Sequence, residues 1–136
     1  MDIFNREKEF DEVKMLNPLV WAYVGDSVYE LYVRIHLTNT SNAKPHKLHM
    51  ESIKYVKAKA QADILLKIED KLTEEEKDIV RRGRNTESHH LPKHATAVDY
   101  MYSTAFEALI GYLYLTKQTD RLNIILKESI DYAENI

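Results

Sequence analysis

Cysteine is absent from the 136-residue sequence. Its absence excludes disulfides, thiolate nucleophiles and Cys-ligated zinc or iron–sulfur centres, and it is typical of a cytoplasmic protein. Glycine and proline are scarce, with three of each, so collagen-like and low-complexity chains are excluded. Hydrophobic residues make up 44% of the chain, which is too many for a disordered protein. We therefore expect residues 1–136 to form a single globular domain.

Long hydrophobic runs are absent as well. The most apolar stretches, Leu19 to Val28 and Ala105 to Leu115, are short and each contains an acid, whereas a membrane span needs about 18 or more apolar residues. The N-terminus is acidic and has no basic start followed by an apolar stretch, so we expect neither a secretory signal nor a transit peptide. These features predict a cytoplasmic protein with no membrane partner.

Helical periodicity is the main pattern that the sequence does contain. Apolar residues recur at spacings of three and four, and no segment alternates like a strand, so we predict an all-α domain. Capping signals at Asn17–Pro18 and at Thr73–Glu76 begin two of the helices. The predicted helices span residues 18–37, 46–68, 73–83, 97–115 and 119–133. The second of these has an apolar stripe through Met50, Ile53, Val56, Ala60, Ile64 and Ile68.

Charge is segregated along the chain, although the net charge is only −3. Lys44 to Lys59 contains five lysines against Glu51, and residues 81–94 contain four basic residues against Glu87. Two basic segments in an acidic protein are typical of a surface that binds a polyanion such as nucleic acid. The alternative interpretation, that these are ordinary solvated helix faces, stays open on this feature alone.

Two isolated acids stand in the two most apolar segments. Asp26 lies in LVWAYVGDSVYELYV, on the same helical side as Ala22, Tyr29 and Val33, and the opposite side is apolar too. A helix that is apolar all round is expected to be buried. Glu107 is the only charged residue between Tyr100 and Leu115. Each segment also carries a glycine, Gly25 or Gly111, where two backbones can approach closely.

A buried carboxylate is costly unless it is paired, hydrogen-bonded or bound to a metal. Asp26 and Glu107 therefore suggest a shared site for Mg²⁺, which prefers oxygen ligands. The alternative is that each acid is satisfied by Arg34, a tyrosine hydroxyl or a helix N-terminus. Glu30 lies four residues before Arg34, the favourable spacing for a helical ion pair. The histidines show no zinc-binding spacing.

These motifs together resemble a known family. YVGDSVYELYVR resembles the signature helix of ribonuclease III, and FEALIGYLYL resembles the second acidic helix of its catalytic domain. The RRGRN segment, the length and the absence of a double-stranded-RNA-binding domain resemble the Mini-ribonuclease III subgroup of stand-alone catalytic domains. The resemblance implies a helical homodimer that hydrolyses double-stranded RNA with Mg²⁺. It further implies maturation of the large-subunit (23S) ribosomal RNA precursor, with a ribosomal protein as a possible partner that presents the substrate.

Residue by residue, the resemblance assigns metal-binding and catalytic roles to Asp26 and Glu107. Leu19, Ala22 and Thr104 stand where full-length ribonuclease III has further carboxylates. That loss supports an alternative, a non-catalytic double-stranded-RNA-binding protein of the same fold that assists ribosome assembly. A plain helical interaction module, the third interpretation, leaves both acids unexplained. The basic residues that we expect to contact RNA are Arg81, Arg82, Arg84, Lys93, Lys44 and Lys47.

Overall fold

The computed structural model of the chain describes residues 9–86 and 96–135. The prediction of an all-α fold is confirmed, because the described residues form helices and the turns between them. In chain order these are α1 (Phe10–Lys14), α2 (Pro18–Thr40), α3 (Pro45–Val56), α4 (Ala58–Ile68), the 3₁₀ turn η2 (Glu69–Lys71), α5 (Glu74–Asn85), α6 (Ala97–Leu115) and α7 (Thr119–Glu134).

Capping interactions begin α2 and α5 where the sequence predicts them. The Asn17 side chain accepts a hydrogen bond of 2.9 Å from the Leu19 N–H at the start of α2. At the start of α5, the Thr73 hydroxyl accepts from the Glu76 N–H at 3.1 Å, and the Glu76 carboxylate accepts from the Thr73 N–H at 2.9 Å. The short helix α1 was not predicted, since its five residues carry too little periodicity.

The prediction of one continuous helix over residues 46–68 is wrong. Lys57 has an extended backbone (φ −63°, ψ 153°), which ends α3 and begins α4. The two helices therefore face the core with different sides. Met50 and Ile53 of the predicted stripe are exposed, and Ser52 and Tyr55 are buried in their place. In α4 the stripe is confirmed, because Ala60, Ile64 and Ile68 are all buried.

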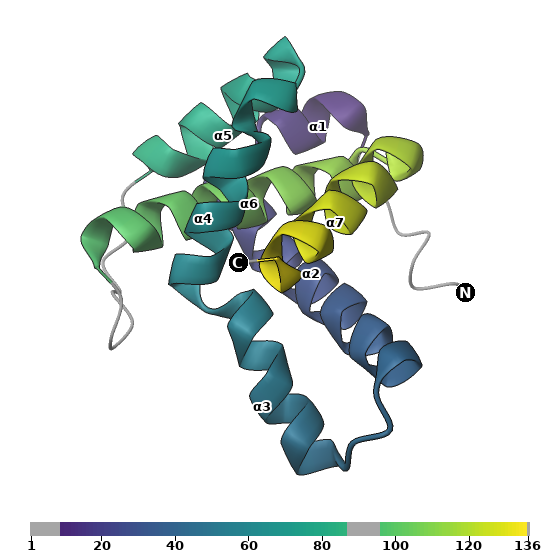
Figure 1. Cartoon of the computed structure of the whole chain (residues 1–136). Helices are drawn as coiled ribbons and strands as arrows, with labels where there is room; N and C mark the ends of the chain where they lie inside the picture. Colours follow the sequence, from purple (N-terminus) through teal and green to yellow (C-terminus); the bar gives the residue numbers. More distant parts are fainter. Residues whose placement is uncertain (1–8, 87–95, 136) are drawn as a thin grey trace.

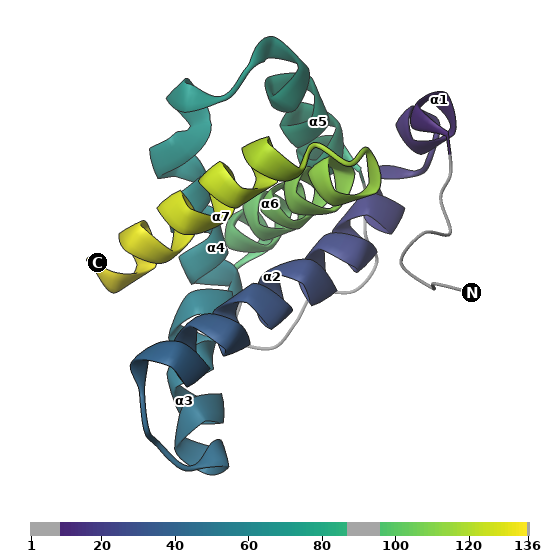
Figure 2. The same ribbon diagram turned by 90° about the vertical axis from the view of Figure 1, so that its right-hand side faces the viewer.

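The central element of the bundle is α6, which α2, α4, α5 and α7 all contact (Figures 1 and 2). Its side chains Phe106, Leu109 and Leu113 are fully buried in the core. The α2–α3 hairpin extends away from the rest of the bundle (Figure 1). A partly buried ion pair links α5 to α7: the Arg121 guanidinium donates to both carboxylate oxygens of the buried Glu76, at 2.8 and 2.9 Å.

The sequence predicts that α2 is buried on all sides, but the structure buries only one side. Its inner side is buried through Trp21, Ala22, Gly25, Tyr29, Val33 and Leu37. Its outer side is exposed, with Val20 at 41%, Tyr23 at 80%, Leu31 at 60% and Ile35 at 51% of their accessible area. The chain thus leaves a row of apolar side chains uncovered on α2. None of the helices formed by residues 9–86 and 96–135 has the length and apolarity needed to cross a membrane.

Candidate active site

The site is built where α2 crosses α6, at the two glycines. A Cβ atom added to Gly25 would lie 1.8 Å from the backbone oxygen of Glu107, and one added to Gly111 would lie 1.8 Å from the backbone oxygen of Trp21. The two backbones are therefore in direct contact, which only glycine permits. The close approach that the sequence predicts is confirmed. It places Asp26, next to Gly25 in the chain, beside Glu107.

Asp26 and Glu107 form a carboxyl pair at the surface end of this crossing. Their side chains are within hydrogen-bonding range of each other. Glu107 is half-buried. Asp26 is exposed, so the prediction that Asp26 is buried is wrong. Asp26 lies at the border between the buried and the exposed side of α2, and helical periodicity alone does not show where that border falls. The pair is therefore accessible from solvent.

The surroundings of the pair disfavour the charged form of Glu107. Burial raises the pKa of the Glu107 carboxyl to about 9, and the neighbouring negative charges of Asp26 and Glu30 add to this rise. Arg34, one of the predicted alternatives for satisfying these acids, forms its ion pair of 3.4 Å with Glu30 instead. The two adjacent carboxyl groups could hold a positively charged ligand.

The donor set suits a hard cation. Asp26 and Glu107 supply carboxylate oxygens, and a divalent ion would relieve the repulsion that raises the pKa of Glu107. Over residues 9–86 and 96–135 no group of three or more His, Cys, Asp or Glu side chains is arranged to hold a metal. The pair thus offers two protein ligands, and Ala22 and Thr104, where the longer enzymes have further acids, are buried and uncharged.

Sequence reasoning missed Gln61, which also belongs to this site. It is 2% exposed, lies in the first turn of α4 and hydrogen-bonds the Glu107 carboxyl. The signal was present, because Gln61 occupies the same helical stripe as Ile64, Leu65 and Ile68. A polar residue on a core-facing stripe requires a partner.

The predicted RNA-contacting residues lie in different surroundings. Lys44 and Lys47 are exposed at the N-terminal end of α3. Arg82 is engaged in packing: its guanidinium stacks 4.7 Å from the Trp21 ring and donates to the backbone oxygen of Lys14 at 3.1 Å. It therefore fastens α5 to the N-terminal part of the fold, a role that the sequence did not reveal.

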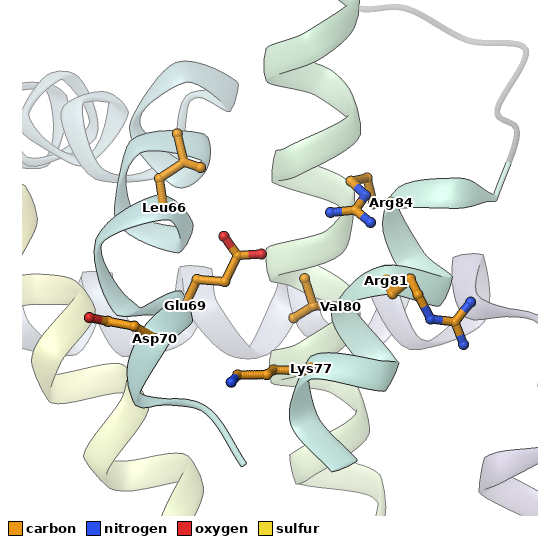
Figure 3. A pocket seen from close by; sticks show the side chains of 7 residues that line it. All are labelled: Leu66, Glu69, Asp70, Lys77, Val80, Arg81 and Arg84. Carbon is orange, nitrogen blue, oxygen red and sulfur yellow. The ribbon is translucent and has the colours of Figure 1, made fainter. Parts of the chain in front are cut away.

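Arg81 and Arg84 line one wall of a cleft of about 610 Å³ between α5 and the end of α4. Figure 3 shows these arginines and Lys77 on the α5 wall, with Glu69 and Asp70 on the opposite wall. Arg81 pairs with Asp78 of its own helix. Neither Asp26 nor Glu107 lines this cleft. Lys93, together with His89, His90 and His94, lies outside the described residues.

Comparison with known proteins agrees with this geometry. The Ribonuclease III domain family matches residues 19–118, which include both Asp26 and Glu107. A protein of Thermoanaerobacter sp. strain X514 named Mini-ribonuclease 3 is 51% identical over 122 residues, or 90% of this chain and 86% of the relative. The Mini-ribonuclease 3 of Streptococcus pneumoniae is 45% identical over 125 residues, or 90% of this chain and 98% of the relative.

The fold has a counterpart among solved structures. A crystal structure of a Fusobacterium nucleatum protein superposes with a TM-score of 0.79 at 30% sequence identity, covering 88% of this chain and 96% of the other. The resemblance predicted from the signature helix, the second acidic helix and the RRGRN segment is thereby confirmed. The chain belongs to the ribonuclease III family of endoribonucleases, among relatives named Mini-ribonuclease 3.

Proposed function

We propose that this endoribonuclease hydrolyses double-stranded RNA at the site formed by Asp26 and Glu107, with Mg²⁺ as its cofactor. The observation that carries the proposal is the placement of two carboxyl groups side by side and open to solvent, at the glycine crossing of α2 and α6. Membership of the ribonuclease III family supports the double-stranded substrate.

Asp26 and Glu107 would hold the metal through their carboxylate oxygens. When bound, Mg²⁺ supplies charge neutralisation at the phosphate and a water of lowered pKa for in-line attack. Because Glu107 is held protonated by burial and by Asp26, it must release its proton for the pair to act as ligands. The exposure of Asp26 leaves room for a phosphate of the RNA to approach the pair.

We propose that residues 1–136 form a single catalytic domain, which would contact the RNA duplex directly. A-form RNA is recognised mainly through its phosphates and 2′-hydroxyls. We propose that Lys44 and Lys47 at the start of α3 and Arg81 and Arg84 on α5 make such contacts, with Lys93 completing the set. Arg81 would have to exchange its ion pair with Asp78 for a phosphate. Arg82 belongs to it only in part, since its guanidinium already packs on Trp21.

We further propose a homodimer formed through the outer side of α2. Large contiguous apolar patches on a protein surface mark interaction sites. Tyr23, Leu31 and Ile35 lie on one side of the helix and are each more than half exposed. A second copy of the same helix would cover them and satisfy the symmetry expected of a homodimer.

The large-subunit (23S) ribosomal RNA precursor is the proposed natural substrate, in the cytoplasm, with a ribosomal protein as the partner that presents it. Support comes from the relatives named Mini-ribonuclease 3, which match across most of the chain.

The test is cleavage of long double-stranded RNA by the purified protein, with Mg²⁺ and with a chelator, beside Asp26→Asn and Glu107→Gln. We expect Mg²⁺-dependent scission that both substitutions abolish, while circular dichroism shows both variants folded. Asp131→Asn is the control and should cleave like wild type, because Asp131 is an exposed acid near the C-terminal end of α7. Tight RNA binding without scission in any metal would contradict the proposal and favour the non-catalytic RNA-binding protein.

A further inference from the structure

Gln61 is a buried amide on the core-facing side of α4. It lies between Ala60 and Ala62, and all three are at most 5% exposed. Burying an amide without partners costs on the order of 2 kcal/mol or more. An apolar side chain of the same length would avoid that cost and pack equally well on the stripe with Ile64. Packing alone therefore gives no reason for glutamine at this position.

Its partner supplies the reason. The Gln61 side chain hydrogen-bonds the Glu107 carboxyl, and of the groups that act on that carboxyl it is the one that favours the charged form. An amide N–H₂ group donates to a carboxylate and carries no charge of its own. A lysine or arginine in the same place would also donate, but its positive charge would compete with a cation for the two acids. Glutamine orients the carboxylate and leaves the negative charge available.

The contact between Gln61 and Glu107 joins two helices that pack against each other. Gln61 belongs to α4 and Glu107 to α6, and these two helices pack closely against each other in the core. Asp26 approaches the same carboxyl from α2. The Glu107 side chain is therefore fixed from two helices at once, with a donor on one side and the second acid on the other.

We propose that Gln61 is a positioning residue of the acidic site, which orients the Glu107 carboxylate toward Asp26 so that both can bind one divalent cation. This inference rests on the proposed function and adds a third residue, from a third helix, to the pair. Partners that orient metal ligands commonly change metal affinity or activity by about 10- to 100-fold when they are replaced.

The test compares Gln61→Met with wild type, because methionine keeps the length and burial of the side chain and removes the donor. Gln118→Met is the matched control: Gln118 follows the far end of α6, where its amide donates to Thr116 at 2.8 Å. The readouts are Mg²⁺ binding by calorimetry, the Mg²⁺ concentration for half-maximal cleavage, and RNA binding without metal.

For Gln61→Met we expect metal affinity to fall by about 10-fold or more and the Mg²⁺ midpoint of cleavage to rise correspondingly. RNA binding should not change, and Gln118→Met should titrate like wild type. A folded Gln61→Met protein with the wild-type metal midpoint overturns the positioning role and leaves the proposed function intact. A wild-type protein that neither binds Mg²⁺ nor cleaves overturns the proposed function and the positioning role with it.

A second measurement tests the contact itself without metal or activity. In the wild-type protein the side-chain amide protons of Gln61 should exchange slowly with solvent in NMR spectra, and their resonances should shift in Glu107→Leu. Fast exchange and unshifted resonances in that variant would overturn the inference even if Gln61→Met failed to fold.

Discussion

Gly25→Ala should separate the two helices that form the acidic site. The added Cβ would lie 1.8 Å from the Glu107 backbone oxygen, and side-chain Cβ atoms essentially never come closer than 3.0 Å to such an atom. The backbones of α2 and α6 must therefore move apart by about 1.2 Å. Both contacting groups are backbone, so no rotamer change can relieve the clash.

Two opposing effects set the magnitude. Alanine is favoured over glycine inside a helix by about 1 kcal/mol, whereas overpacking costs about 1–3 kcal/mol and occasionally more. Because the obstacle is rigid, we expect the upper end of that range and a net loss of about 2 kcal/mol in the free energy of unfolding. Native domains have a free energy of unfolding of about 5–15 kcal/mol, so the variant should stay folded.

Activity should fall further than stability. A shift of about 1 Å between catalytic groups can cost about 100-fold in rate, and here the shift lies between Asp26 and Glu107. Urea denaturation and single-turnover cleavage of double-stranded RNA measure the two effects separately. Gly83→Ala is the control, since its Cβ would meet the Ala108 Cβ at 2.9 Å and would push α5, not α2, away from α6. If Gly25→Ala were as stable and as active as wild type, the argument from the glycine crossing would be refuted.

Three further predictions concern charge and assembly. The Glu107 pKa of about 9 lies above its ordinary value of 4.5, so the metal-free protein should lose stability as pH rises through this interval; thermal unfolding should show a flatter pH profile for Glu107→Gln. Replacing Lys44 and Lys47 by alanine should weaken RNA binding and reduce the slope of its logarithmic salt dependence by about 2, measured by filter binding across a salt series. Leu31→Glu should convert the proposed homodimer to monomers in sedimentation velocity, whereas Leu66→Glu, at a position of similar exposure on α4, should not.

Local signals predicted most of the helix boundaries. The caps at Asn17 and Thr73 satisfy N–H groups within three residues, so neighbouring sequence suffices to locate them. The break at Lys57 carries no glycine or proline, so no local signal marks it. It separates α3, which packs mainly on α2, from α4, which packs mainly on α6. Gly83 was predicted to end α5, yet the helix continues to Asn85, because this glycine makes room for Ala105 and Ala108.

Local signals likewise predicted some residues of the candidate site and missed others. Asp26 and Glu107 stood out because each is an isolated charge in an apolar helix, and the two glycines indicated where those helices meet. Gln61 was missed because its partner is 46 positions away, on a helix whose packing against α4 the sequence does not state. Arg82 was grouped with the basic surface because charge patterning does not distinguish a solvated guanidinium from one stacked on Trp21.

The error about α2 carries information of its own. An apolar circumference predicts that something covers the helix, and the chain covers only the side that contains Trp21, Tyr29 and Val33. The sequence pattern cannot distinguish burial within one chain from burial between two, because the hydrophobic effect is the same in both cases. The uncovered side that includes Leu31 and Ile35 is therefore what the composition of α2 predicts if the folded unit is a pair of chains. Asp26 borders that side, so in the proposed homodimer the second copy would lie next to each acidic site.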